Sequence, residues 1–425
     1  MARLMKRSIL RNLQSAIYGQ KQPLSSASYF LAKSISRIED DKSTRLLKVQ
    51  WENGKENLYP YLFLRDHCQC PECFHPFTKS RKLDTVAAVD LGITIDDFAY
   101  DASDDVVEVT WPDGHKSRFT AEWLKSRFLS RKGEQINDRT GLDSVQRVSW
   151  TSMEIRENTP FVDFHEIESD EKALKGHLEN LLRYGLSIVR NAPLELSVLQ
   201  KMADLMCLSI VRHTNYGPFF TVESKPSPSN LAYTGSALPM HTDLPFYDYQ
   251  PGVQLLHCIR QSSGSESDGA SLLVDAMKVV EDLKGNSPED YHLLTTTNFR
   301  FNDEGTDLYG EFDLQFERPT IGLDKNGKFV HMAYNNVVRD FINAPAENIQ
   351  RIYEAYYKLS AMLRDKHYQF QYKMAPGDML VFDNKRLMHG RTAFDPTTAD
   401  RMLNGCYLDW DDIRSTWRVL HSRHE

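Results

Sequence analysis

Short stretches of alternating apolar and polar residues characterise the first part of the chain. Alternation over four to eight residues is typical of half-buried β-strands, and turn-forming segments such as 111–115 separate the stretches. We therefore predict a small β-rich domain over residues 40–130, followed by a polar linker over 131–150. The predicted strands are residues 46–51, 57–64, 106–111 and 116–119.

The remainder of the chain, 151–425, mixes helical and strand-like patterns. Apolar residues recur every three or four positions in 170–185 and 196–209, so both are predicted helices around a buried strand at 187–193. From 250 to 410 strands dominate, interrupted by one long helix at 346–364. Many modest strands with few crossover helices favour an antiparallel double-sheet barrel with flanking helices over a doubly wound fold. The predicted strands are residues 252–259, 270–275, 327–336, 377–384 and 402–410.

Length, charge and cysteine content narrow the protein class. A chain of 425 residues is long enough for two domains. Its net charge of −8 suits nucleic-acid phosphates poorly, so no nucleic-acid partner is expected. No run of 18 apolar residues occurs, so no membrane span is expected. Six cysteines are too few for a secreted disulfide scaffold of this size.

The N-terminal segment, residues 1–38, has a composition of its own. Basic residues and serines recur, no acid precedes Glu39, and apolar residues form a helical stripe. This is typical of a mitochondrial transit peptide, although a disordered basic tail would share the composition. We expect mitochondrial targeting, with a cytoplasmic location as the alternative. The stripe consists of Leu4, Ile9, Leu13 and Ile17.

Three cysteines, Cys68, Cys70 and Cys73, lie within six residues. Structural zinc takes four tetrahedral Cys or His ligands, so a fourth ligand must come from elsewhere. His67 and His75 are adjacent, but His115, in a turn between two predicted strands, is the better candidate. Three reduced buried thiols, or a redox Cys-x-x-Cys motif without its usual βαβ context, are the alternatives.

A second candidate metal site combines His241 and Asp243 with His389. Residues i and i+2 of a strand point the same way, so His241 and Asp243 can share one metal ion, and His389 would complete the site from a neighbouring strand. Non-heme Fe(II) oxygenases use two imidazoles and one carboxylate and leave positions open. Alone, His-x-Asp is a weak signal, and a surface pair is the simpler interpretation. Arg401, which begins the strand-like segment 401–407, strengthens the hypothesis because a guanidinium can hold a dicarboxylate co-substrate.

Together these elements resemble the γ-butyrobetaine and trimethyllysine dioxygenase family, within the taurine-dioxygenase-like superfamily. The resemblance extends from about residue 45 to the end of the chain. It implies a mostly β oxygenase core, a double-stranded β-helix (jelly-roll) with flanking helices. It also implies a small N-terminal zinc-binding domain with His115 as the fourth ligand. The segments that carry it are 64–73, 111–115, 241–243, 251–259, 382–391, 401 and 405–412.

The resemblance also implies roles for individual residues. His241, Asp243 and His389 would bind iron, and Arg401 and Ser271 would bind 2-oxoglutarate. An aromatic cage would hold a trimethylammonium group, and two asparagines its carboxylate end. Phe220 stands where a tryptophan is expected, and Leu244 where the γ-butyrobetaine members have an aromatic residue. The cage residues are Tyr216, Phe220, Tyr233 and Tyr407, and the asparagines are Asn230 and Asn335.

The activity implied by this resemblance is hydroxylation of 4-trimethylammoniobutanoate to L-carnitine, with dioxygen and 2-oxoglutarate as co-substrates, Fe(II) as cofactor and ascorbate as reductant. The sister reaction on trimethyllysine is the nearest alternative, favoured by the transit-like N-terminus. Cys70 and the segments 251–261 and 409–412 favour the reaction on 4-trimethylammoniobutanoate. An inactive, zinc-stabilised binding protein is an alternative of another class. A homodimer is the expected assembly.

Overall fold

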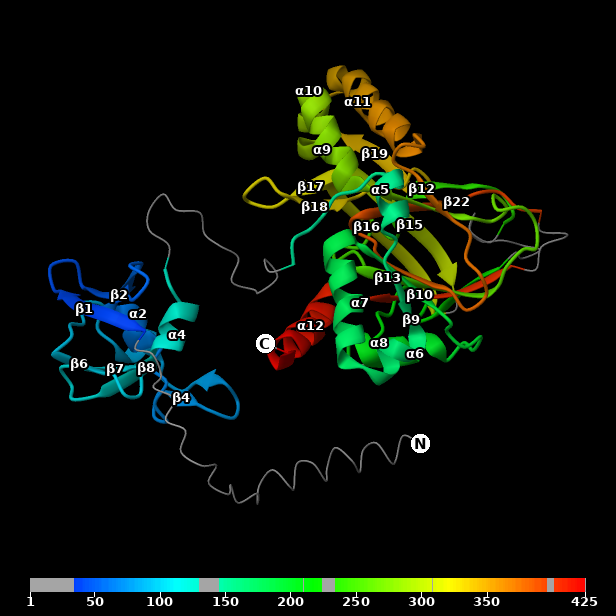
Figure 1. The fold of residues 1–425 in the computed structure, drawn as a ribbon. Helices are drawn as coiled ribbons and strands as arrows, with labels where there is room; N and C mark the ends of the chain where they lie inside the picture. The colour runs from blue at the N-terminus through cyan, green and yellow to red at the C-terminus, as the bar shows by residue number, and fades with distance from the viewer. Residues whose placement is uncertain are drawn as a thin grey trace. The chain divides into compact units, whose positions relative to one another are not determined.

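The computed structural model describes residues 34–129, 145–208, 210–223, 234–307, 309–395 and 401–424. The chain divides into two compact units, residues 1–137 and 138–425 (Figure 1). Each is described by itself. Residues 1–33 of the predicted targeting segment, and most of the predicted linker, lie outside the described residues.

The N-terminal unit contains two three-stranded antiparallel sheets, ordered β1-β2-β3 and β6-β7-β8. Alternate residues of each strand point into a shared core, as the two-residue period of the sequence predicts. On β2, Leu47 and Val49 are fully buried, and Phe119 of β8 is nearly so. The strands are β1 (Ile35–Asp41), β2 (Leu46–Trp51), β3 (Glu56–Pro60), β6 (Asp97–Asp101), β7 (Val106–Thr110) and β8 (Lys116–Thr120).

Short elements complete this unit. The strand predicted over 57–64 is wrong in its second half, because β3 ends at Pro60 and helix α2 follows. Proline has no N–H with which to continue a ladder, and Tyr61, Leu64 and Arg65 are all buried at helical spacing. The short elements are α2 (Tyr61–Asp66), β4 (Phe74–His75), β5 (Ser80–Arg81), α3 (Thr85–Ala88) and α4 (Ala121–Ser126).

Two folded regions begin earlier than the sequence patterns indicate. Strand β1 starts at Ile35, which is fully buried, so residues 35–38 of the predicted targeting segment belong to a sheet. In the second unit, Val145 and Trp150 are buried although they fall in the predicted linker. The Trp150 backbone N–H donates to the Asp275 carboxylate at 3.1 Å, which ties this stretch to the second unit.

The second unit is built on a six-stranded sheet, β11-β23-β13-β21-β10-β9, and a four-stranded sheet, β12-β22-β14-β20. Neighbouring strands are antiparallel, except that β9 and β10 are parallel. The strands are β9 (Phe161–Asp163), β10 (Leu186–Arg190), β11 (Phe220–Glu223), β12 (Leu238–His241), β13 (Val253–Arg260), β14 (Ser271–Asp275), β20 (Phe370–Tyr372), β21 (Met379–Asp383), β22 (Leu387–Arg391) and β23 (Met402–Leu408).

The two sheets pack face to face over a shared apolar layer. Leu380 and Phe382 of β21 lie in one cluster with Leu273 of β14 and Leu387 of β22. The opposite face of the six-stranded sheet packs against α6, α7, α8 and α12 (Figure 1). These helices are α6 (Phe164–Ser169), α7 (Glu171–Tyr184), α8 (Val198–Met206) and α12 (Trp410–His424).

A second helical layer, α9, α10 and α11, packs together around another apolar cluster (Figure 1). The prediction of one long helix at 346–364 is confirmed by α11 (Ala346–Arg364), but the prediction that it alone interrupts the strands is wrong. Helix α9 (Ala276–Asn286) begins where Asp275 caps the Met277 N–H, and α10 (Pro288–Thr296) has proline in its first turn.

The remaining elements lie beside this layer. A long hairpin, β15 and β16, pairs with β19, and a short hairpin is formed by β17 and β18. Among the described residues, no helix combines the length and apolar character needed to cross a bilayer. The elements are α5 (Ser152–Glu157), β15 (Asn298–Asp307), β16 (Gly310–Pro319), β17 (Ile321–Leu323), β18 (Phe329–Met332) and β19 (Arg339–Asn343).

Candidate active site and metal centres

The structure brings His241, Asp243 and His389 together. His241 ends β12 and lies directly opposite His389 of β22 in the antiparallel register, with ring centroids 4.2 Å apart. Asp243 follows two residues later, beyond the end of the strand, so the prediction that both ligands lie on one strand is wrong. Its Oδ1 lies 3.2 Å from His241 Nε2 and 3.5 Å from His389 Nε2. The three side chains therefore present two imidazole nitrogens and one carboxylate oxygen close enough to share a metal ion.

Hydrogen bonds around the triad fix its orientation. His241 Nδ1 lies 2.8 Å from the Pro239 carbonyl oxygen, so donation there leaves Nε2 free to act as a ligand. Buried Asn384 holds the Asp243 backbone at both ends: its Oδ1 accepts from the Asp243 N–H at 2.8 Å, and its Nδ2 donates to the Asp243 carbonyl at 3.0 Å. Gln250 donates to the same carbonyl at 2.8 Å.

The ionisation of the triad follows from this proximity. Burial would raise the pKa of Asp243, yet the facing His389 and His241 rings hold it well below its usual range. Burial likewise opposes charging of His241, but the Asp243 carboxylate outweighs it and raises the pKa of His241. Burial and the neighbouring His241 lower the pKa of His389. The carboxylate is therefore ionised, and the lowered pKa keeps His389 neutral. Asp243 favours a proton on His241, which a bound cation would displace, because ligation requires both imidazoles to be neutral.

A cavity of about 210 Å³ adjoins the triad, which contributes to its wall. Two buried arginines, Arg391 and Arg401, also line it. Arg391 donates to the backbone carbonyls of Thr234 and Ser236 at 2.6 and 2.8 Å. Arg401 makes no hydrogen bond or ion pair to a described residue. Burial lowers its pKa to about 10, and its guanidinium lies 5.7 Å from the Phe394 ring centroid. Such a buried cation is matched to an anionic ligand.

Aromatic and small polar side chains complete the wall. Phe220 and Tyr407 lie with ring centroids 5.2 Å apart, and Tyr216, Asn335 and Ser271 also line the cavity. Gly405 admits the Phe220 ring, because a Cβ there would come within 2.5 Å of it. The structure thus places four of the six predicted substrate-binding residues in one cavity. The other two, Asn230 and Tyr233, lie outside the described residues.

Several residues of the site were missed by the sequence-based prediction. Asn384, Gln250 and Arg391 have no recognisable pattern of their own, because their roles depend on contacts between distant segments. Leu244 lines the cavity with a φ of 56°, a left-handed conformation that a leucine rarely adopts. The chain therefore turns sharply immediately after Asp243, at a strained position of the kind found in active sites.

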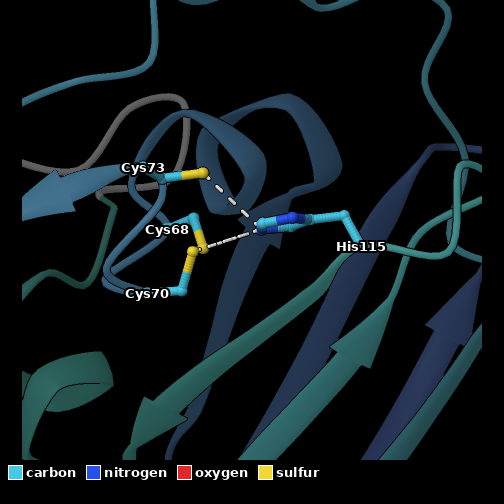
Figure 2. Close-up of side chains that lie close together, drawn as sticks. All are labelled: Cys68, Cys70, Cys73 and His115. Atoms are coloured by element: carbon cyan, nitrogen blue, oxygen red, sulfur yellow. Dashed lines mark hydrogen bonds between the residues drawn. The ribbon is translucent and has the colours of Figure 1, made fainter.

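The N-terminal unit contains the second cluster, shown in Figure 2. His115, in the turn between β7 and β8, directs Nε2 towards Cys68, Cys70 and Cys73, at 3.3, 3.6 and 3.5 Å from their Sγ atoms. His67 and His75, the other histidines considered, are not part of this cluster. The structure therefore brings together the predicted four residues.

This cluster fits a tetrahedral zinc ion. With Zn–S near 2.3 Å and Zn–N near 2.05 Å, tetrahedral angles separate S and N by about 3.6 Å, close to the three observed distances. Burial raises the pKa of Cys68 to about 11, a cost that coordination removes because a bound cation deprotonates the thiol. Burial and nearby Arg65 lower the pKa of His115, which keeps it in the neutral, ligating state.

Comparison with known proteins agrees with both units. Residues 154–407 match the family described as "Taurine catabolism dioxygenase TauD, TfdA family", and residues 38–125 match "Gamma-butyrobetaine hydroxylase-like, N-terminal". The chain is 36% identical to the γ-butyrobetaine dioxygenases of Pongo abelii and Homo sapiens, over 93% of this chain and 99% of each relative.

A second group of relatives carries the sister activity in its name. The mitochondrial trimethyllysine dioxygenase of Bos taurus is 32% identical, over 85% of this chain and 82% of the relative. The family expected from the sequence is thereby confirmed, as is the enzyme class. The chain belongs to the TauD, TfdA family of Fe(II)- and 2-oxoglutarate-dependent dioxygenases and carries the N-terminal domain of γ-butyrobetaine hydroxylase-like proteins.

Proposed function

We propose that this dioxygenase hydroxylates 4-trimethylammoniobutanoate to L-carnitine, a reaction of carnitine biosynthesis. The observation that carries the proposal is one cavity that joins the His241, Asp243 and His389 triad to an aromatic wall and to the buried Arg401, which has no anionic partner among the described residues. The 36% identity to γ-butyrobetaine dioxygenases over nearly the whole chain supports the same substrate.

The donor set of the triad fits Fe(II). Two neutral imidazoles and one monodentate carboxylate form the ligand set of non-heme iron oxygenases, and the adjoining cavity leaves room for further ligands. His241 Nε2, Asp243 Oδ1 and His389 Nε2 would hold the ion. When bound, iron supplies the activation of dioxygen that hydroxylation of an unactivated CH₂ group requires, with ascorbate as the reductant that maintains Fe(II).

Arg401 is assigned to the co-substrate. 2-Oxoglutarate carries two carboxylates, and a planar guanidinium can bind one of them through two parallel hydrogen bonds. Burial without a carboxylate partner among the described residues leaves Arg401 available for this role, whereas Arg391 already donates to two carbonyls. Ser271, buried in the same wall, offers a hydroxyl to the co-substrate.

The aromatic wall is assigned to the quaternary ammonium. A trimethylammonium group cannot donate a hydrogen bond, but the faces of aromatic rings attract it. Tyr216, Phe220 and Tyr407 provide such faces, with Tyr233 assigned from the family resemblance. Asn335 lies in the wall and is assigned with Asn230 to the carboxylate end of the substrate.

The charges of the wall favour butyrobetaine over trimethyllysine. Among the described residues that line the cavity, Asp243 is the only acid, and both of its oxygens already have partners. Trimethyllysine carries, besides its trimethylammonium group, an α-ammonium group that needs a hydrogen-bond acceptor. 4-Trimethylammoniobutanoate has no such second cationic group. This observation supports the substrate that lacks a second cation.

Further assignments accompany this function. We propose that the face-to-face sheets form the double-stranded β-helix within a dioxygenase domain, expected over 151–425 and extended to Val145 by the burial of that residue. We propose also that the N-terminal domain, expected over 40–130 but starting at Ile35, binds zinc through Cys68, Cys70, Cys73 and His115. Mitochondrial location is supported by the basic segment, with cleavage placed before β1 because Ile35 is buried in the sheet. Relatives named mitochondrial support the same location, with the cytoplasm as the alternative. The proposed assembly is a homodimer.

Product analysis with each substrate tests the proposal. The full chain is incubated with Fe(II), 2-oxoglutarate, ascorbate and either 4-trimethylammoniobutanoate or trimethyllysine, and products are identified by mass spectrometry. We expect butyrobetaine to gain one oxygen atom with stoichiometric release of succinate. Much faster turnover of trimethyllysine would assign the sister activity. No turnover of either would favour a zinc-stabilised binding protein.

A further inference from the structure

The two oxygens of the Asp243 carboxylate have different partners. Oδ1 faces both imidazoles, at 3.2 Å from His241 Nε2 and 3.5 Å from His389 Nε2. Oδ2 accepts a hydrogen bond of 2.7 Å from the hydroxyl of Tyr407. A carboxylate held in this way presents a single oxygen to the metal position, because the other oxygen is bound to a fixed donor.

Tyr407 is itself fixed by its strand. It lies on β23 opposite Gln254 of β13 and is almost fully buried. Its ring faces the cavity beside Phe220, at a centroid distance of 5.2 Å. One side chain therefore contributes an aromatic face to the substrate wall and a hydroxyl to a metal ligand. These two contacts are made by different atoms and can be removed separately.

We propose that Tyr407 is a positioning residue that keeps Asp243 monodentate through its hydroxyl, in addition to the role of its ring in the substrate wall. The proposal rests on the proposed function only in treating the triad as the metal site. Without the hydroxyl, the carboxylate can rotate about its terminal torsion, which is broad for aspartate, and offer both oxygens. The ion would then be held less firmly in the geometry that the two histidines set.

The distinguishing experiment is a metal titration that needs no turnover. Mn(II) favours carboxylate and water ligands over thiolates, so it is expected at the triad and leaves the thiolate site to zinc. The electron paramagnetic resonance signal of free Mn(II) reports its binding. We expect Tyr407→Phe to weaken Mn(II) binding by roughly 10-fold to 100-fold, the usual effect of removing an outer hydrogen bond to a metal ligand. Because the ring remains, KM for the trimethylammonium substrate should change by less than about 3-fold.

Two further variants separate positioning from packing. Tyr216→Phe removes a hydroxyl from the same cavity wall, but this hydroxyl lies 3.5 Å from Asp303 rather than at the triad, so Mn(II) affinity should remain at the wild-type value. Tyr407→Leu lacks both ring and hydroxyl. It should weaken Mn(II) binding as much as Tyr407→Phe does and also raise the substrate KM. Circular dichroism checks that each variant is folded. If Tyr407→Phe does not fold, Tyr407→Leu provides the test.

Unchanged Mn(II) affinity in a folded Tyr407→Phe protein would overturn the proposal. So would an equal loss of affinity in Tyr216→Phe, because the effect would then be general to the wall. Failure of the substrate assignment gives a different result: the wild-type protein would turn over neither trimethylammonium compound, while the ordering of Mn(II) affinities among the variants would still hold.

Discussion

The two metal-ligand clusters of this chain differ in what surrounds them. In the N-terminal unit, four donors converge from two segments, and the three Sγ–Nε2 distances agree with a tetrahedral shell that they fill completely. In the second unit, three donors lie at the edge of a cavity of about 210 Å³, which leaves the rest of the shell to ligands from that cavity. A filled shell can stabilise a fold, whereas an open one can bind substrates.

The surrounding charges differ as well. Arg65 donates to Cys73 Sγ at 3.3 Å, so the thiolate cluster has a cation that offsets its negative charge. Beside the triad, by contrast, the buried Arg401 has no anionic partner among the described residues. The first arrangement is electrostatically complete, and the second becomes so only when an anionic co-substrate enters. The following changes are ordered from the largest expected effect on turnover to the smallest.

Loss of a triad ligand should have the largest effect. His241→Ala, Asp243→Ala and His389→Ala should each lower hydroxylation by roughly three orders of magnitude or more, because the metal shell loses one of three protein ligands. Succinate release with saturating Fe(II) measures this. His292→Ala, an exposed histidine on α10, is the matched control and should retain activity. Near-native turnover of the three triad variants with iron still bound would refute the assignment.

Arg401→Ala should act mainly on the co-substrate. Loss of a charge-assisted bidentate contact should raise KM for 2-oxoglutarate by about 10-fold to 100-fold, with little change in KM for the trimethylammonium substrate. A kinetic matrix in both substrates separates the two constants. Arg401→Lys keeps the charge but not the two parallel donors of the guanidinium, so its KM for 2-oxoglutarate should lie between those of the wild type and Arg401→Ala. An effect confined to the trimethylammonium substrate would show that the cavity has been oriented incorrectly.

Phe220→Leu should have a smaller effect than Arg401→Ala, and it should act on KM for the trimethylammonium substrate instead of KM for 2-oxoglutarate. Removing one aromatic face should raise KM for the quaternary ammonium substrate by roughly 2-fold to 30-fold and leave 2-oxoglutarate affinity nearly unchanged. Tyr233→Leu, at the position assigned from the family, should behave in the same way. The kinetic matrix used for Arg401 provides the measurement. If either substitution weakens 2-oxoglutarate instead, the aromatic cage is misplaced.

Cys70→Ser should have the smallest effect on turnover. Loss of one thiolate should release zinc and lower the melting temperature of the N-terminal unit by about 10 °C or more, because zinc binding contributes folding free energy. Calorimetry and elemental analysis measure the two quantities. Below the transition, turnover should stay near the wild-type value. Finding no zinc in wild-type protein purified without chelator would contradict the assignment.

Much of the fold followed from local patterns. Helix α11 has the predicted bounds because its apolar residues keep the helical period throughout, and α7 ends at Tyr184, directly before Gly185, which adopts a left-handed φ of 70°. Residues 57–64 were misread because an unbroken run of apolar and aromatic residues follows Pro60 and shows no helical pattern by itself, whereas the burial of those residues follows the helical period. Helices α9 and α10 were missed in a region of strong strand signals.

The candidate site was predictable in part. The metal-ligand residues were found from their spacing and from the family resemblance, since His-x-Asp alone is common. The prediction that His389 comes from a neighbouring strand is confirmed, but the exact register that sets it opposite His241, and the contacts of Asn384 with Asp243, could not be predicted. Both join segments more than 100 residues apart, and no local period encodes which polar side chain will reach which backbone group.

The contrast between the two clusters is tested most directly by comparing Cys70→Ser and Asp243→Ala side by side for zinc content, melting temperature and turnover. A structural cluster and a catalytic one should give opposite results. Cys70→Ser should lose zinc and thermal stability but hydroxylate normally while folded. Asp243→Ala should keep zinc and the wild-type melting temperature but lose hydroxylation. If a folded Cys70→Ser protein has lost turnover, or if Asp243→Ala retains it, the division of roles between the two clusters is wrong.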